Sequence, residues 1–331
     1  MSPSPADAAP RGDVAFGLDA PTEPEALGIA QFLARAFGPS TVALIHYGSH
    51  ARRSDARPES AHDFFVIVDR YGDAFRALNR SVGTRFSPRT ATALARVLPP
   101  NVLAVAVPTH PVRAKCAVLT VRDLTRLCSP TAKDHFTQGR LFQQVQVAWC
   151  RDPAGREAVI GALVRARIGT FHWARPYLPQ RFTAEEYCRT LLETSFRAEV
   201  RPEREDRVAS LLAAQRAVLL RAYDALLRRL AGDGVLALED GAYRQVQPPG
   251  ALQSFRVRLH FGRSKARAIL RWAKFIVLYE DWLGYIVAKI ERRSGMAVEL
   301  TERERRWPLV FLWPKFIRYF RTRRQQQPLP R

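Results

Sequence analysis

Two short apolar runs joined by a Gly-Ser turn constrain the fold of this chain more than any other feature. Residues 64–68 read Phe-Phe-Val-Ile-Val, with Asp63 before them and Asp69 after them. A short, β-branched and aromatic run of this kind is typical of an interior strand. Residues 42–47 form a second run, which ends at Gly48-Ser49. The pattern therefore predicts a strand, a glycine turn, a loop and a second strand.

Further runs extend this pattern to a mixed sheet followed by helices. Residues 101–107 and 114–121 also have β-like composition. Apolar residues spaced by three and four predict helices over residues 23–37, 206–231 and 264–290. We therefore expect an α/β (α+β) fold. Its expected parts are a disordered tail over 1–20, a mixed-sheet domain over 21–150, a mostly helical domain over 151–235 and a basic helical region over 236–331.

The charge of the chain indicates an anionic partner. The formal net charge is +21, from 52 Lys and Arg against 31 Asp and Glu. Nucleic acid, an anionic membrane surface and a phosphorylated substrate all fit this excess. The four cysteines form no C-x-x-C pair, so neither a zinc site nor a disulfide framework is indicated, and a reducing cytoplasm is favoured. The first twenty residues lack the apolar core of a signal peptide, and no run is apolar enough to predict a spanning helix.

Gly48, Ser49 and Asp63 have the chemistry of a metal and triphosphate site. Nucleotidyl transfer needs a divalent metal held by carboxylates and a backbone that approaches a triphosphate without a side chain in the way. Gly48 would let the chain touch the phosphates, Ser49 would donate a hydrogen bond to them, and Asp63 would bind magnesium. The alternative is a glycine turn beside a strand-capping aspartate, and both interpretations fit this stretch.

The stretch HDFFVIVD, residues 62–69, resembles the mitochondrial-type phosphatidate cytidylyltransferase (CDP-diacylglycerol synthase) family, of the translocator-maintenance type. The family motif is a Tyr-Gly-Ser, a spacer, then an aspartate, hydrophobic residues and a closing Val-Asp. As in that family, an apolar residue, Phe65, holds the place of the second carboxylate of related nucleotidyltransferases. Further similar segments follow in the family's order, from about residue 40 to about residue 230: Asn101, Lys115-Cys-Ala-Val118, Gly139-Arg-Leu-Phe-Gln-Gln-Val145, Phe182-Thr-Ala-Glu-Glu186, Ser195 to Arg201 and Glu205 to Val208.

The chain also departs from the family pattern. Gln143 stands where the family prefers lysine, Glu199 where it has aspartate, and Cys116-Ala117 where it has Tyr-Gly. Glu199 keeps a carboxylate with a longer reach, whereas Gln143 replaces a charged phosphate contact with a neutral group. The resemblance is therefore that of a remote, bacterial member.

The resemblance implies a nucleotidyltransferase-like domain and one reaction, in which CTP and phosphatidic acid give CDP-diacylglycerol and pyrophosphate. Mg²⁺ is the implied cofactor. The implied catalytic residues are Asp63, Asp69 and Lys115, and the implied metal ligands are Asp63, Asp69 and Glu199. The implied contacts to CTP or phosphate are Gly48, Ser49, Asn101, Arg140 and Arg201. For two of these residues a structural role is the alternative, since Lys115 could be a surface strand residue and Asp69 could simply end its strand.

The C-terminal segment combines positive charge with aromatic residues. Residues 261–331 hold 17 Lys and Arg against 6 Asp and Glu, which is +11 of the total +21. Aromatic residues flanked by cations suit an interfacial anchor on anionic lipid. We expect the anchor to include Trp307, Phe311, Trp313, Lys315, Phe316 and Arg318. The alternatives are a helix packed against residues 264–290 and a stacking platform for single-stranded nucleic acid, and the dense apolar cluster argues against the second.

The sequence thus predicts a peripheral enzyme on the cytoplasmic face of the inner (cell) membrane, with CTP, phosphatidic acid and an anionic membrane surface as partners. Two alternatives remain. One is a nucleotidyltransferase with a different acceptor. The other is a membrane-binding pseudo-transferase that lost catalysis when its motif eroded.

Overall fold

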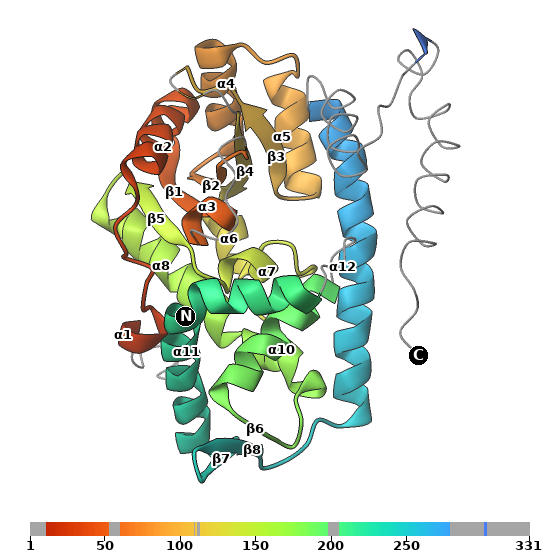
Figure 1. Ribbon diagram of the computed structural model, residues 1–331. Helices are drawn as coiled ribbons and strands as arrows, with labels where there is room; N and C mark the ends of the chain where they lie inside the picture. Colours follow the sequence, from red (N-terminus) through yellow and green to blue (C-terminus); the bar gives the residue numbers. More distant parts are fainter. Residues whose placement is uncertain are drawn as a thin grey trace. The chain divides into compact units, whose positions relative to one another are not determined.

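The structure, a computed structural model, describes residues 11–52, 60–108, 110, 113–197, 205–278 and 301–302 (Figure 1). The chain divides into two compact units, residues 1–278 and 279–331. The fold described below is that of the first unit. Among the described residues, no helix combines the length and the apolar character needed to cross a membrane.

A five-stranded mixed sheet forms the centre of the upper half in Figure 1, with the strand order β3-β4-β2-β1-β5. Its members are β1 (Thr41–Tyr47), β2 (Asp63–Val68), β3 (Asn101–Val105), β4 (Ala114–Thr120) and β5 (Gln146–Cys150). β2 and β4 are parallel, and the other pairs are antiparallel. Residues 64–68 of β2 are all fully buried, which explains why the strand is a continuous apolar run. The predicted α/β fold class with a mixed sheet and a helical region is confirmed.

Alternate residues of β2 contribute to two different cores. Phe64, Val66 and Val68 pack with α2 (Pro24–Phe37), α4 (Tyr71–Val82) and α5 (Pro88–Val97). Phe65 and Ile67 belong to the larger core, which the second set of helices completes. That set is α1 (Arg11–Val14), α6 (Val121–Leu127), α7 (Gln138–Leu141), α8 (Pro153–Ile168), α9 (Thr170–Ala174), α10 (Ala184–Arg197) and α11 (Glu205–Gly232). Each face of the sheet therefore has its own helical cover.

The helical half also contains a small sheet that the sequence pattern did not predict. It has the order β6-β8-β7, with β6 (Arg181–Phe182), β7 (Leu236–Glu239) and β8 (Ala242–Gln245). The other short elements are α3 (Gly48–Arg52), directly after β1, and the 3-10 turn η2 (Arg175–Tyr177). The β7-β8 hairpin turns through Asp240 and Gly241, which both have positive φ.

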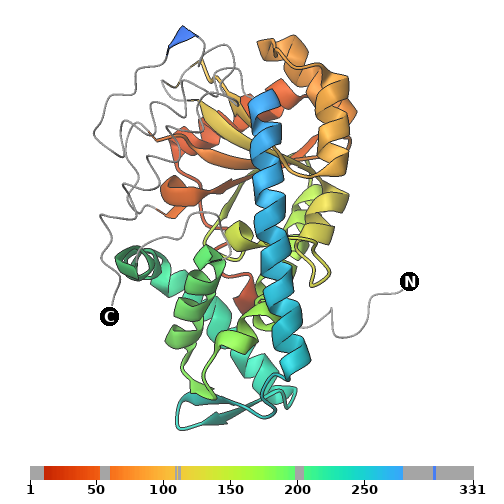
Figure 2. The same ribbon diagram turned by 90° about the vertical axis from the view of Figure 1, so that its right-hand side faces the viewer.

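The long helix α12 (Ala251–Leu278) connects the two halves of this unit (Figure 2). It begins thirteen residues before the predicted start at 264, and the predicted part beyond 278 lies outside the described residues. Its early residues Val257 and Phe261 join the larger core, and Leu278 joins the other. Lys274 donates hydrogen bonds to the carbonyl oxygens of Leu98 and Pro100, just before β3.

The predicted division into parts needs correction. Residues 11–20 of the predicted disordered tail are ordered, because α1 lies there and Val14 and Leu18 are buried in the larger core. That core also includes residues on both sides of positions 150 and 235. These two predicted boundaries therefore do not separate independent cores.

Candidate functional site

The first residues of β2 and β4 form the centre of the candidate site. The two strands are parallel and in register, so Asp63 pairs with Lys115. Paired residues of neighbouring strands point to the same face of a sheet, and an aspartate and a lysine at such positions are in reach of each other. On the other side of β2, Asp63 pairs with Tyr47, the last residue of β1. The fold thus places the end of β1 beside the starts of β2 and β4.

Gly48 approaches Asp63 so closely that a side chain has no room there. Its φ is +88°, a conformation that glycine adopts readily and other residues avoid. A Cβ atom at this position would lie 2.7 Å from Oδ2 of Asp63. The turn requires glycine because the backbone of residue 48 lies directly against the side chain of Asp63.

Four positively charged or ionisable side chains act on the Asp63 carboxyl. Burial raises its pKa, and Lys115, Arg140, Arg52 and His50 oppose that rise. Lys115 comes from β4, Arg140 from α7, and both Arg52 and His50 from α3. In the described part of the chain, one carboxylate lies here among several cations, which makes this end of the sheet suitable for an anion that carries more than one negative charge.

The two arginines are held by neighbouring groups. Arg140 donates from Nη1 to the carbonyl oxygen of Phe136 over 2.8 Å, and its guanidinium lies 4.0 Å from the centre of the Phe136 ring. Arg52 donates from Nη1 to Oε1 of Gln143 over 3.3 Å. The amide nitrogen of Gln143 in turn donates to the carbonyl oxygen of Gly139 over 2.9 Å. Gln143, where the family prefers lysine, thus supports a cation that comes from α3.

Asp69 does not reach this site, so its predicted role as a ligand of the same metal is wrong. Asp63 opens β2 and Asp69 follows its last residue. Six residues of strand separate their Cα atoms by about 20 Å. The Asp69 carboxylate instead accepts a hydrogen bond from Arg151 over 2.6 Å at the other end of the sheet, where both side chains are exposed.

Asn101 is also distant from Asp63. It pairs with Val118 on β4, which pairs with Val66, three residues along β2 from Asp63. Its side-chain nitrogen donates to the carbonyl oxygen of Ala91 in α5 over 2.8 Å. Asn101 therefore joins α5 to the sheet, and its contact with a substrate stays a prediction.

The remaining predicted residues divide into two groups. Ser49 follows Gly48 within α3 and is half-buried. Glu199 and Arg201 lie outside the described residues, as do the predicted membrane-associating residues Trp307, Phe311, Trp313, Lys315, Phe316 and Arg318. The structure thus brings together Gly48, Ser49, Asp63, Lys115 and Arg140.

The residues present can accommodate magnesium in one arrangement. Mg²⁺ commonly binds through one or two carboxylates together with phosphate oxygens of the substrate. Asp63 supplies one carboxylate, and Gly48 places no side chain against its Oδ2 atom. Among the described residues, Asp63 would therefore hold Mg²⁺ together with the phosphates.

Several residues at this end of the sheet were not predicted from the sequence. One of them is Arg52, four positions after Gly48. A short helix brings a residue at that spacing back toward its start, so the spacing was the available signal. A cluster on the opposite face of the sheet, formed by Glu25, His62 and His110, was not predicted either. Burial is the main cause that lowers the pKa of His62, and of its neighbour His46, to about 4.

No protein-family model matches the chain, and no curated protein is significantly similar to it.

Proposed function

We propose that this protein is a nucleotidyltransferase that uses a nucleoside triphosphate, and that its reaction is that of a phosphatidate cytidylyltransferase. The observation that carries the proposal is the pairing of Asp63 with Lys115 beside the side-chain-free backbone of Gly48. Arg140 and Arg52 add positive charge at the same place. The choice of CTP and phosphatidic acid rests on the family resemblance of the stretch 62–69 and of the segments that follow it.

The chain's own groups would bind and orient the reacting phosphates. Lys115, Arg140 and Arg52 would attract the triphosphate, and the guanidinium groups can each donate two parallel hydrogen bonds to phosphate oxygens. Gly48 would allow the backbone to approach the phosphates closely. When bound through Asp63, Mg²⁺ neutralises phosphate charge and so favours departure of pyrophosphate.

The transfer itself requires no general base from the protein. A phosphate monoester has a second pKa of about 6 and is largely dianionic at neutral pH. One of its oxygens forms a bond with the α-phosphorus of CTP while the bond from that phosphorus to the β-phosphate oxygen breaks. The products are CDP-diacylglycerol and pyrophosphate, so atoms and charge balance. Positioning and electrostatic stabilisation then account for the rate.

The exposed side of α12 supports a membrane-associated enzyme. Leu252, Phe255, Leu259, Ile269 and Leu270 are each more than half exposed. The first three of these residues are spaced by three and four positions, and the last two follow about three helical turns later. All five side chains therefore lie on the same side of the helix. The exposed cations Arg256, Arg258, Arg263 and Lys265 lie along the same helix. An apolar stripe with flanking cations is the pattern of a helix that rests on anionic lipid.

Turnover with purified protein tests the proposal. We expect transfer of label from CTP to phosphatidic acid in liposomes when Mg²⁺ is present. Asp63→Asn and Lys115→Ala should each lower turnover by at least about 100-fold, because each removes a charged group that acts on the reacting phosphates. Lys133→Ala is the matched control, since it removes an exposed lysine outside the site.

The outcomes separate the alternatives. Transfer of the nucleotide to an acceptor other than lipid would show that the protein is a nucleotidyltransferase with a different acceptor. Binding of CTP without turnover would indicate a pseudo-transferase. Full activity of Asp63→Asn would show that the reaction occurs elsewhere on the chain.

A further inference from the structure

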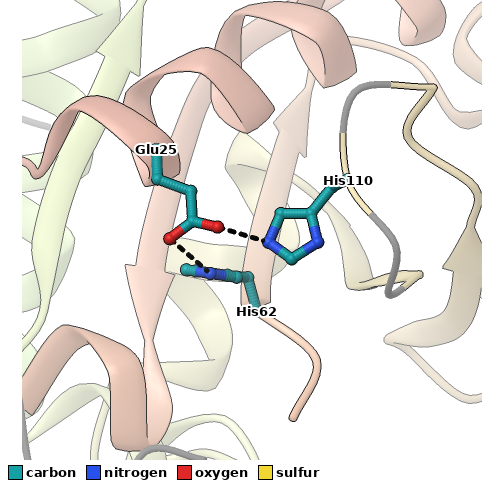
Figure 3. A group of neighbouring side chains, drawn as sticks. All are labelled: Glu25, His62 and His110. Carbon is teal, nitrogen blue, oxygen red and sulfur yellow. Dashed lines mark ion pairs between the residues drawn. The ribbon is translucent and has the colours of Figure 1, made fainter. Parts of the chain in front are cut away.

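Three side chains that can bind a metal converge near the start of β2 (Figure 3). Glu25 lies in the first turn of α2, His62 directly precedes β2, and His110 follows β3. Oε1 of Glu25 is 2.7 Å from Nε2 of His110, and Oε2 is 3.8 Å from Nε2 of His62. One ligand atom from each of the three residues lies within 4.8 Å of the other two.

A chain of hydrogen bonds fixes which nitrogen of His62 carries a proton. The amide nitrogen of Gln146 donates to the carbonyl oxygen of Pro21 over 3.2 Å, so its Oε1 must be the atom that faces His46. Nδ1 of His46 therefore donates to Oε1 of Gln146, at 3.4 Å. The imidazole of His46 is buried, and a ring with one proton carries that proton on Nδ1 here. Its Nε2 atom is consequently an acceptor.

The hydrogen bond from His62 to His46 determines which nitrogen of His62 carries the proton. Nδ1 of His62 is 3.2 Å from Nε2 of His46, so it must be the donor of that hydrogen bond. In the neutral ring, Nε2 of His62 then has no proton and presents a lone pair. This atom is buried and has no hydrogen-bond partner. The ring is held in place by stacking on His50, whose centroid is 3.9 Å away.

The lone pair of His62 Nε2 and the carboxylate of Glu25 repel each other, and a cation bound between them would remove this repulsion. Nε2 of His62 is directed at the same carboxylate that His110 approaches, and a buried polar atom without a partner is costly. Ligands about 2.1 Å from a tetrahedral metal are separated from one another by about 3.4 Å. The measured separations of 2.7 and 3.8 Å lie on both sides of that value.

We propose that Glu25, His62 and His110 bind a divalent transition-metal ion of the Zn²⁺ type. Two imidazole nitrogens and one carboxylate oxygen favour such an ion over Mg²⁺, which prefers oxygen ligands. The side chain of Glu25 is 61% exposed, so the ion keeps a position open to water or to a ligand from solution. Gln146 and His46 act as positioning residues, because their hydrogen bonds orient His62. None of the three proposed ligands belongs to the proposed nucleotide site, and His50 lies between the two, because it stacks on His62 and also acts on the Asp63 carboxyl.

Metal titration of the full chain tests the proposal. Protein freed of metal with a chelator is titrated with Zn²⁺ by calorimetry and with Co²⁺ by visible absorption, which reports the ligand field. We expect one tight Zn²⁺ per chain and Co²⁺ bands of a low-coordinate nitrogen and oxygen site. Glu25→Gln and His110→Asn should weaken Zn²⁺ binding by at least about 100-fold, and Gln146→Leu by about 10- to 100-fold.

The control is His172→Asn, which removes an exposed histidine on α9 and should bind Zn²⁺ as the wild type does. Wild-type affinity in both Glu25→Gln and His110→Asn would overturn the proposal, as would a wild type that binds no Zn²⁺ at micromolar concentration. The side chain of Glu25 is 61% exposed and that of His110 only 6%, so near-ultraviolet circular dichroism of both variants checks that the native packing is kept. If Gln146→Leu unfolds, the Zn²⁺ affinities of Glu25→Gln and His110→Asn still test the proposal.

Discussion

Gly48→Ala should separate the close approach at Asp63 from ordinary backbone strain. The new Cβ atom would lie 2.7 Å from Oδ2 of Asp63, whereas ordinary contacts begin at 3.4 Å. The carboxylate must therefore move by about 0.7 Å or the turn must open. A misplacement of about 1 Å can cost about 100-fold in rate, so we expect turnover to fall by about 10- to 100-fold. The positive φ adds a strain of about 1–2 kcal/mol to the folded state.

Gly83→Ala is the matched control for this strain. Gly83 follows α4 with a φ of +65°, and a Cβ atom there would meet nothing within 4 Å. Both variants should lose about 1–2 kcal/mol of unfolding free energy, which lowers the melting temperature by about 2–8 °C. Only Gly48→Ala should also lose nucleotide affinity and turnover. Equal activity in the two variants would refute the reasoning, because the close contact would then have no functional consequence.

Two further predictions concern the buried charges that join α12 to the rest of the unit. Asp134, whose side chain is fully buried, accepts hydrogen bonds from Arg267 and Arg271 at 2.6 Å each, so Asp134→Asn should cost about 3–5 kcal/mol in urea unfolding. Asp240→Asn, which alters an exposed pair with Arg181 at 3.4 Å, should change stability by less than about 1 kcal/mol. Burial is the main cause that lowers the pKa of Lys274 to about 7, below the unfolded value of about 10.4. The unfolded chain therefore binds more protons between these values, and the unfolding free energy of the wild type should rise from pH 7 to pH 10 relative to that of Lys274→Met.

The strand pattern alone was sufficient to locate the centre of the candidate site. A continuous apolar run predicts a strand buried on both faces, and β2 is such a strand. The same geometry rules out Asp69, since a strand of this length separates the residues at its two ends by about 20 Å. Strand length, read from the sequence, could therefore have excluded Asp69 as a partner of Asp63.

The positions of the cations around Asp63 were harder to predict from the sequence. The register that pairs Lys115 with Asp63 depends on β4 lying parallel to β2, with about fifty residues between them. Arg140 arrives on a four-residue helix, α7, whose place is set by packing of Leu141 and Phe142 in the larger core. Local propensity carries little information about such long-range placement.

Strand alternation also determines how the two sites relate, and this yields a last prediction. His62 and Asp63 are consecutive, so their side chains point to opposite faces of the sheet. The stacking of His46 on Phe64, at 4.9 Å between centroids, places the histidines on the face of α2. The sequence could indicate this face but not Glu25 and His110, which arrive from α2 and from the segment after β3. Because no proposed metal ligand belongs to the nucleotide site, Asp63→Asn should keep wild-type Zn²⁺ affinity and Glu25→Gln should keep wild-type CTP affinity. Calorimetric titration of both ligands into both variants measures this. Loss of both ligands in either variant would show that the two faces respond together through the backbone at the start of β2.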